Sequence, residues 1–367
     1  MGVEDVRTAG GSEDVTAGAE SRTHLRQMLV IGAISSVVGV AVALAIDWFP
    51  TQASTQGESI DRLYDVLLIF SVPVFVLVEV VVLYCVWRFR MRPGEELKDG
   101  PPIHGNTKLE IIWTAIPAIL LVCLCSYAYI VLTDVEEADA RALNVRVVGE
   151  QFTWTFHYRS PEGRDVASPQ LYVPVGRQVN FTVQSKDVIH DFWVPAFRMK
   201  IDAVPGIDTH LRVTAKRVGQ YPVVCAELCG LGHSVMRQTA HVVPVGEFDR
   251  WLRDRAAQAE GGGGAPGGGE EQGGQATAAD GKAVFADAGC GACHALADAG
   301  TNGTVGPDLD EVVPGQDPAF IRESIVDPNA EVAQGFSPDV MPNNFGETLS
   351  PDELDALVEY LASETQG

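Results

Sequence analysis

Three long apolar runs constrain the fold of this chain more than any other feature. They cover residues 28–46, 66–87 and 110–132, and an α-helix of about 20 such residues crosses the hydrocarbon core of a bilayer. The second and third runs together predict a transmembrane helical hairpin over 62–135. We therefore expect a multi-pass membrane protein with further domains outside the lipid.

Flanking charges predict which side of the membrane those domains occupy. Basic residues precede the first run and fill the segment between the second and third, whereas Arg62 is the only basic residue between the first and second. By the positive-inside rule the N-terminal tail, 1–27, is cytoplasmic, and the chain after residue 132 is extracytoplasmic. The run at 28–46 also has the features of a signal peptide, so a retained helix and a cleaved leader both stay open.

The rest of the chain divides into two domains and a linker. Apolar residues alternate in stretches such as NVRVVGEQFTWTFHY, which predicts a sandwich or Greek-key barrel of short strands over 140–255. The Gly-rich residues 256–278 predict a flexible linker, and 279–367 a second domain. A formal net charge of -23 argues against a nucleic-acid partner, because phosphates would repel such a chain.

The stretch CAELCGLGHSVM, residues 225–236, gathers four metal donors in one loop. A structural zinc site commonly uses CxxC pairs and no methionine, whereas a thioether is a good ligand for copper. A single copper needs two histidines, and His190 in DVIHDFW is the best second candidate. Two thiolates can also bridge two copper ions, each with one histidine and one weaker ligand. The predicted copper ligands are His190, Cys225, Cys229, His233, Met236 and a backbone carbonyl.

The stretch CGACH, residues 290–294, is the attachment motif of a c-type haem. Cys290 and Cys293 would form the thioethers, and His294 would be the proximal axial ligand. Met341 is the one methionine after residue 236, which makes it the predicted sixth ligand. Histidine–methionine ligation raises the haem potential and suits an electron carrier that supplies an oxidase.

The copper loop, with HDFWVPAFRMKIDAVPG upstream, resembles subunit II of the haem–copper cytochrome c oxidases and its dinuclear CuA centre. The resemblance covers about residues 60–250. It implies N-terminal transmembrane α-helices followed by a cupredoxin-like Greek-key β-barrel, and CGACH adds a small all-α cytochrome c domain. With that fused domain the chain is similar to the caa3-type oxidases.

The resemblance also implies roles for single residues. The main-chain carbonyl of Glu227 would complete the copper shell, and its side chain would bind a magnesium ion at the border with subunit I. Glu110, in HGNTKLEIIWTAIP, would lie at the mouth of a proton path into subunit I. Pro307, in GPDL, would orient His294 through its carbonyl. One departure is Phe152, which stands where the family often has the tryptophan that accepts electrons; a core aromatic is the alternative role.

The implied function is that of an electron-transfer subunit of a cytochrome c oxidase. Electrons from cytochrome c or a bc1-type complex would pass through haem c and CuA to subunit I, where O2 is reduced to water with proton pumping. Other oxidase subunits and membrane lipid would be the remaining partners. Two alternatives stay open: the CuA subunit of a nitric oxide reductase, and a membrane-anchored electron carrier without a catalytic partner.

Overall fold

The computed structural model describes residues 10–91, 93–94, 105–260 and 278–364. Residues 1–9 of the predicted tail and 261–277 of the predicted linker lie outside these ranges. The chain forms two compact units, one holding 1–48 and 59–132, the other holding 49–58 and 133–367. Each unit is described by itself.

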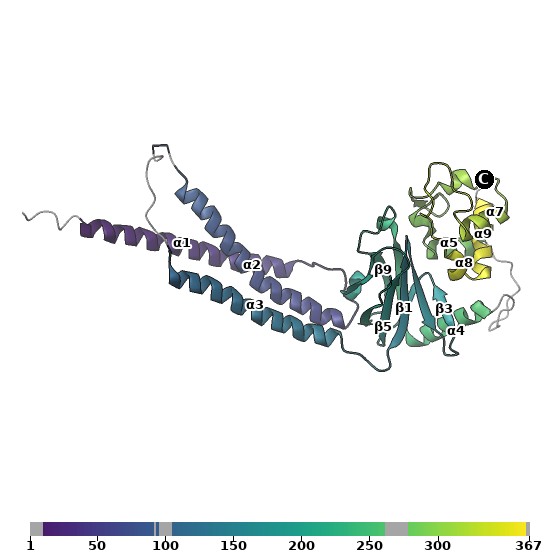
Figure 1. Cartoon of the computed structure of the whole chain (residues 1–367), viewed down its shortest axis with the longest axis horizontal. Helices are drawn as coiled ribbons and strands as arrows, with labels where there is room; N and C mark the ends of the chain where they lie inside the picture. The colour runs from purple at the N-terminus through teal and green to yellow at the C-terminus, as the bar shows by residue number, and fades with distance from the viewer. Residues whose placement is uncertain (1–9, 92, 95–104, 261–277, 365–367) are drawn as a thin grey trace, which may run out of the picture. The chain divides into compact units, whose positions relative to one another are not determined.

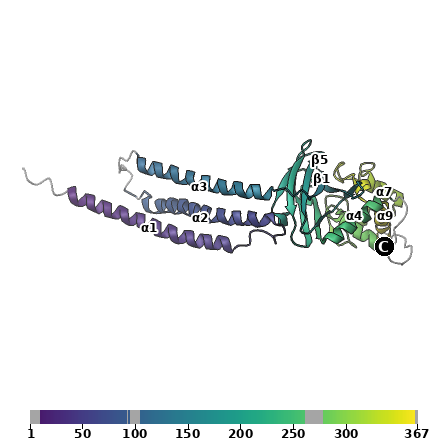
Figure 2. The same cartoon turned by 90° about the horizontal axis from the view of Figure 1, so that it is seen from below.

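The first unit is built from three long helices, which Figure 2 shows as separate rods. Each helix contains a segment long and apolar enough to cross a membrane, as predicted. In the contact between the first two, a Cβ added at Gly39 would lie 2.9 Å from Val72 Cγ1, so this glycine permits close packing. The helices are α1 (Gly10–Ala45), α2 (Gln56–Phe89) and α3 (Thr107–Val135).

The second unit begins with a sandwich of two five-stranded sheets (Figure 1). Their strand orders are β3-β2-β1-β5-β8 and β4-β10-β9-β6-β7, and β1–β5 and β10–β4 are the parallel pairs. This agrees with the predicted cupredoxin-like fold. The strands are β1 (Leu143–Glu150), β2 (Thr153–Arg159), β3 (Asp165–Ser168), β4 (Leu171–Pro174), β5 (Gln178–Ser185), β6 (His190–Trp193), β7 (Lys200–Ala203), β8 (Thr209–Thr214), β9 (Gly219–Cys225) and β10 (Arg237–Val243).

Alternate residues of the strands fill the core of the sandwich, as the sequence pattern predicts. The rings of Trp154 and Phe181 lie 5.6 and 5.4 Å from that of Phe192, measured between centroids. These three side chains are at most 1% exposed. Aromatic contacts at these distances add to the stability gained from burying apolar area.

A segment that precedes α2 is built into the sandwich. Ala53 and Ser54 are 0% exposed, and Ser54 forms an antiparallel bridge with Ala215. The amide of Ala53 donates to the carbonyl of Ala196 (2.8 Å), and its carbonyl accepts from the amide of Lys216 (2.9 Å). Residues 49–58 are thus a structural part of the sandwich rather than a free connection.

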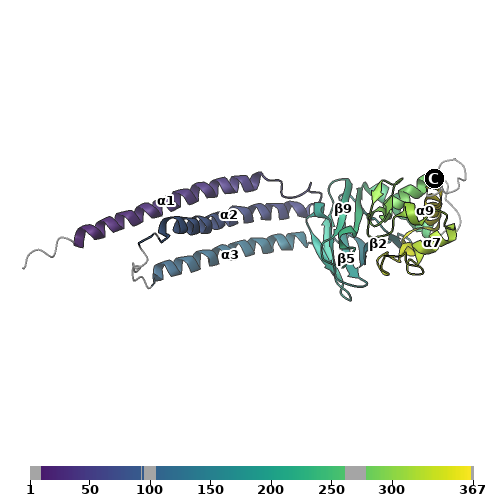
Figure 3. The same ribbon diagram turned by 90° about the horizontal axis from the view of Figure 1, so that it is seen from above.

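The C-terminal part of the second unit is a small helical domain (Figure 3). A Cβ at Gly281 in α5 would lie 2.1 Å from the Ala356 carbonyl oxygen in α9, so a glycine is required there. Ser350 and Glu353 form a capping box at the start of α9, with N–O distances of 2.8 and 3.3 Å. The helices are α4 (Val245–Glu260), which follows the sandwich, and α5 (Ala278–Asp287), α6 (Leu309–Val312), α7 (Pro318–Val326), α8 (Phe345–Thr348) and α9 (Pro351–Glu364).

Short elements complete this unit. They are the 3-10 helices η1 (Pro195–Phe197), η2 (His233–Val235) and η3 (Cys290–Ala292), and the two-residue strands β11 (Ala295–Leu296) and β12 (Thr301–Asn302). Since α4 continues to Glu260, the first five residues of the predicted linker, 256–260, are helical.

Candidate metal centre and haem site

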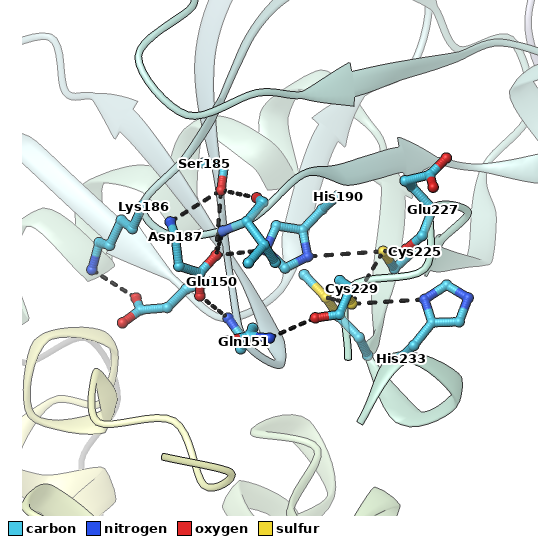
Figure 4. A network of polar contacts seen from close by, with 12 residues as sticks. Glu150, Gln151, Ser185, Lys186, Asp187, His190, Cys225, Glu227, Cys229 and His233 are labelled. Atoms are coloured by element: carbon cyan, nitrogen blue, oxygen red, sulfur yellow. Dashed lines mark hydrogen bonds and ion pairs between the residues drawn. The ribbon is translucent and has the colours of Figure 1, made fainter. Parts of the chain in front are cut away.

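Five predicted copper ligands converge where β6 begins and β9 ends, and Figure 4 labels four of them, His190, Cys225, Cys229 and His233. The sulfur atoms of Cys225 and Cys229 lie 3.8 Å apart. His190 Nδ1 lies 3.9 Å from the first sulfur, and His233 Nδ1 lies 3.7 Å from the second. Met236 Sδ is 3.8 Å from Cys229 Sγ. The structure thus brings together donors from residue 190 and from a loop more than thirty positions later.

Two neighbouring strands position this set. His190 begins β6 and Cys225 ends β9, and these strands are paired with Phe192 opposite Cys225. The loop that follows closes on itself, because the Cys225 amide donates to the Met236 carbonyl at 3.2 Å. The carbonyl oxygen of Glu227 lies 3.2 Å from Cys225 Sγ, while the Glu227 side chain is exposed.

Two residues that the sequence analysis did not single out hold the ligands in place (Figure 4). His190 Nε2 donates to Asp187 Oδ1 at 2.8 Å, which leaves Nδ1 facing Cys225. Asp187 Oδ2 also accepts a hydrogen bond from the main-chain amide of Gln151 at 2.7 Å. The side chain of Gln151 donates from Nε2 to the Cys229 carbonyl at 2.5 Å. Asp187 could have been found from the sequence, because it is an acidic residue three positions before His190. Gln151 could not, because it lies between β1 and β2 of the other sheet.

The donor set has the electrostatics of a cation site. Burial disfavours ionisation of Cys225, but its contact with His190 lowers the pKa of the thiol. Burial and the neighbouring Cys225 raise the pKa of Cys229. A pair of buried thiols resists full ionisation without a cation, and coordination by a metal removes that penalty. The two thiols, two imidazoles and one thioether present therefore fit a copper centre.

Phe152 lies against the copper loop and, like Trp154, belongs to the buried core of the sandwich. A Cβ at Gly232 would lie 2.4 Å from Phe152 Cγ, and one at Gly230 would lie 3.0 Å from Phe152 Cζ. Trp154 is 0% exposed, and its ring lies 5.9 Å from that of His190. Phe152, at 9% exposed, is therefore a core aromatic that also contacts the loop and lines the cavity described next.

The predicted haem ligands line one cavity of the helical domain. Cys290, Cys293, His294, Pro307 and Met341 all contribute to its walls. His294 Nδ1 donates to the Pro307 carbonyl at 2.9 Å, so Nε2 keeps its lone pair. Burial lowers the pKa of His294, which favours the neutral imidazole that binds iron.

A glycine in the cavity wall supports the same assignment. A Cβ at Gly306 would lie 2.5 Å from His294 Cε1, so only glycine leaves the imidazole in this position. The cavity therefore offers two thiols, a neutral imidazole and a thioether, which fit a covalently attached haem.

Comparisons with known proteins decide the family. Family models match in chain order: cytochrome c oxidase subunit II, transmembrane domain, at 40–131; its periplasmic domain at 164–243; and cytochrome c at 278–365. Cytochrome c oxidase subunit 2 of Alkalihalophilus pseudofirmus is 32% identical over 331 residues, which cover 85% of this chain and 90% of that protein. The chain belongs to the cytochrome c oxidase subunit II family.

Other subunit II proteins give shorter matches. Cytochrome c oxidase subunit 2 of Synechocystis sp. is 32% identical over 277 residues, covering 61% of this chain and 82% of that protein. A crystal structure is known for the periplasmic domain of subunit II of cytochrome oxidase from Bradyrhizobium japonicum, whose sequence is 30% identical to this chain. The match covers 34% of this chain and 98% of the crystallised domain, with a TM-score of 0.31. This subunit II chain carries a C-terminal cytochrome c domain as well.

Glu110, the predicted proton-path residue of this subunit II, has a local structural role at the start of α3. Its Oε1 accepts from the Asn106 amide at 3.2 Å, while Asn106 Oδ1 accepts from the Leu109 amide at 3.2 Å. The carboxylate is exposed and helps to satisfy amides that the first helical turn leaves without partners.

The remaining histidines of the sandwich have local partners. His157 lies 3.4 Å from Asp165, and the exposed His210 lies 3.5 Å from Thr182 Oγ1. His241 hydrogen-bonds to Gln170. His104 lies outside the described residues.

Proposed function

We propose that this subunit II chain accepts electrons for a caa3-type haem–copper terminal oxidase, whose subunit I reduces O2 to water with proton pumping. The observation that carries the proposal is the convergence of His190, Cys225, Cys229, His233 and Met236 in a chain that also has a haem attachment cavity. When bound, the copper pair and haem c would each supply a site that gains and loses single electrons with little change in its ligands.

The protein's part is to fix the copper ligands. Cys225 and Cys229 would bridge the two ions, with His190 and His233 as the terminal nitrogen ligands. Met236 and the Glu227 carbonyl would be the weak ligands. Met236 is 0% exposed and Asp187 holds the His190 ring, so little reorganisation is needed when the charge of the centre changes. Low reorganisation favours electron transfer over bond-making chemistry.

In the haem cavity, Cys290 and Cys293 would form the thioether bonds, and His294 and Met341 would be the axial ligands. The Pro307 carbonyl fixes the ring orientation and the tautomer of His294. An external donor, either cytochrome c or a bc1-type complex, would reduce this domain.

Two acidic residues would act at the border with subunit I. The exposed Glu227 side chain would bind a magnesium ion there, as oxygen ligands suit this cation. Glu110, exposed near the start of α3, would lie at the mouth of a proton path. Both roles require the partner subunit, so they are tested in the assembled oxidase.

The contact pattern supports a hairpin topology for the membrane part. Residues 49–58 pack into the sandwich formed by residues after 140, so the chain before α2 and the chain after α3 must lie on the same side of the membrane. The positive-inside rule places that side outside the cytoplasm. Membrane lipid and the other oxidase subunits would surround α1–α3.

Electron paramagnetic resonance of the full chain loaded with copper tests the proposal. We expect hyperfine structure from one unpaired electron shared over two equivalent copper ions. Cys229→Ser should abolish this pattern, while His210→Gln, at an exposed histidine of the same domain, should keep it. A spectrum of one localised copper in the unaltered chain would reject the dinuclear site.

A further inference from the structure

The outer face of β2 is buried, although a sandwich strand normally exposes that face. Trp154 and Phe156 point into the core, so Thr153 and Thr155 lie on the opposite face. These threonines are nevertheless only 6% and 4% exposed. Asn344 of the haem domain contacts Thr155, since its Nδ2 donates to Thr155 Oγ1 at 2.9 Å, and Thr153 lines the haem cavity.

Further contacts join the same two domains. Val340, next to the predicted haem ligand Met341, packs against the core cluster of the sandwich. Arg255 of α4 donates to both carboxylate oxygens of Glu353, at 2.7 and 2.6 Å, and to the Thr348 carbonyl at 3.2 Å. Both contacts with Glu353 come from Arg255 Nη1. The side chains of Arg255 and Glu353 are 13% and 31% exposed, so this charge-assisted contact is better shielded from solvent than an open surface pair.

A third polar contact reaches the haem attachment segment. Gln170, between β3 and β4, donates from Nε2 to the Asp287 carbonyl at 2.8 Å. Asp287 ends α5, three positions before Cys290. We call these three polar contacts the dock: Thr155–Asn344, Arg255–Glu353 and Gln170–Asp287.

With the dock formed, the haem cavity adjoins the copper loop. Side chains of the sandwich complete the cavity wall, and they include Phe152, Val235 and Arg237. Val235 and Arg237 flank the copper ligand Met236 in the sequence, and Phe152 packs on the loop itself. Figure 3 shows β2 on the side of the sandwich that adjoins the haem domain.

The charges of the two domains favour this contact. Residues 278–364 contain 17 acidic and 2 basic residues, a formal net charge of -15. Residues 140–260 contain 12 acidic and 15 basic residues, a formal net charge of +3. Opposite net charges speed encounter and fix orientation between surfaces.

We propose that the dock is the contact that holds the haem domain on the copper domain while an electron passes between their redox sites. One electron would leave the reduced haem and enter the copper pair. No proton would be transferred, and no bond would form or break. This inference rests on the proposed function for the two redox sites. It adds the surface that they share and the residues that hold it.

Arg255→Glu tests the dock in the purified full-length chain carrying copper and haem. Like charges at this contact disfavour docking of the two domains. We therefore expect electron transfer from the photoreduced haem to copper to become slower by about tenfold or more. Amide hydrogen exchange should rise at Thr153–Thr155 and at 340–344. Asn344→Ala, which removes a different contact, should shift both readouts in the same direction but by less.

Arg253→Glu is the matched control, because Arg253 is an exposed arginine of the same helix and the charge change is identical. It should leave both readouts unchanged. If Arg255→Glu matches Arg253→Glu in hydrogen exchange and electron passage, the dock is overturned. If the unaltered chain passes no electron from haem to copper but hydrogen exchange still responds to Arg255→Glu, the contact stands and the proposed function fails.

Discussion

Hydrogen bonds from neighbouring residues position the predicted copper donors, whereas the predicted haem ligands lie on the walls of a cavity. At the copper loop, Asp187 and Gln151 fix His190 and Cys229 through hydrogen bonds, and Met236 is fully buried. In the haem domain, the cavity walls include apolar side chains such as Phe285 and Leu357, which are also part of the domain core. The copper loop is therefore shaped by hydrogen bonds within the sandwich, while the walls of the predicted haem cavity are continuous with the core of the helical domain.

The largest expected effect follows from blocking haem attachment. Cys290→Ala with Cys293→Ala should leave the chain without covalent haem, and α5, α7 and α9 should lose amide protection. We expect a loss of about 5 kcal/mol or more, comparable with the whole stability of a small domain, because the core would keep an empty apolar cavity. Hydrogen exchange measured along the chain checks this.

Cys85→Ala in α2 is the control for removing a thiol, and it should leave the haem domain unchanged. The strands of the sandwich should keep their protection in the double variant. If α9 stays fully protected without haem, the helical domain is self-sufficient and the contrast between the two sites fails.

A smaller effect is expected when the support of the copper ligands is weakened. Asp187→Asn removes the charge that accepts from His190 Nε2, and loss of such a partner typically lowers metal affinity by about 10–100-fold. Copper titration against a competing chelator measures the change. Asp208→Asn is the control, since that carboxylate accepts from Gln184 at 2.7 Å in the same domain. Equal affinities in the two variants would show that the ligands need no such support.

The smallest effect concerns the helical domain's own structure. Ser350→Ala removes half of the capping box of α9, and loss of an N-cap typically costs about 1 kcal/mol. Denaturant unfolding of the haem-loaded chain should show this loss, and Ser363→Ala, near the other end of α9, should not. A loss as large as that of the cysteine variants would mean that the helix, rather than the haem, organises the domain.

Donor candidates could be predicted from the sequence because coordination chemistry restricts which residues can bind a metal. The spacing in 225–236 and the single late methionine, Met341, limit the ligands before any contact is known. The three-part fold was predictable for a similar reason, since apolar runs, alternation and a Gly-rich break are local patterns.

Residues that act across the fold were not predictable in this way. Gln151 supports Cys229 from 78 positions away, and nothing in its local sequence marks it. Phe152, which stands where the family often has a tryptophan, is a second example. Only its three-dimensional contact with Gly232 shows that its ring lies on the loop. Arg255 and Glu353, 98 positions apart, likewise appear as ordinary helix-surface charges in the sequence.

The burial of residues 49–58 has a consequence for how the protein is made. Gln56 and Thr214 are hydrogen-bonded to each other but stand 158 positions apart, and the two helices of the hairpin lie between them in the chain. Contacts of such high sequence separation form late and slow folding. The edge of the sandwich is therefore completed only after both α2 and α3 have crossed the membrane, and a chain in which one of these helices failed to cross would keep Gln56 and Thr214 on opposite sides.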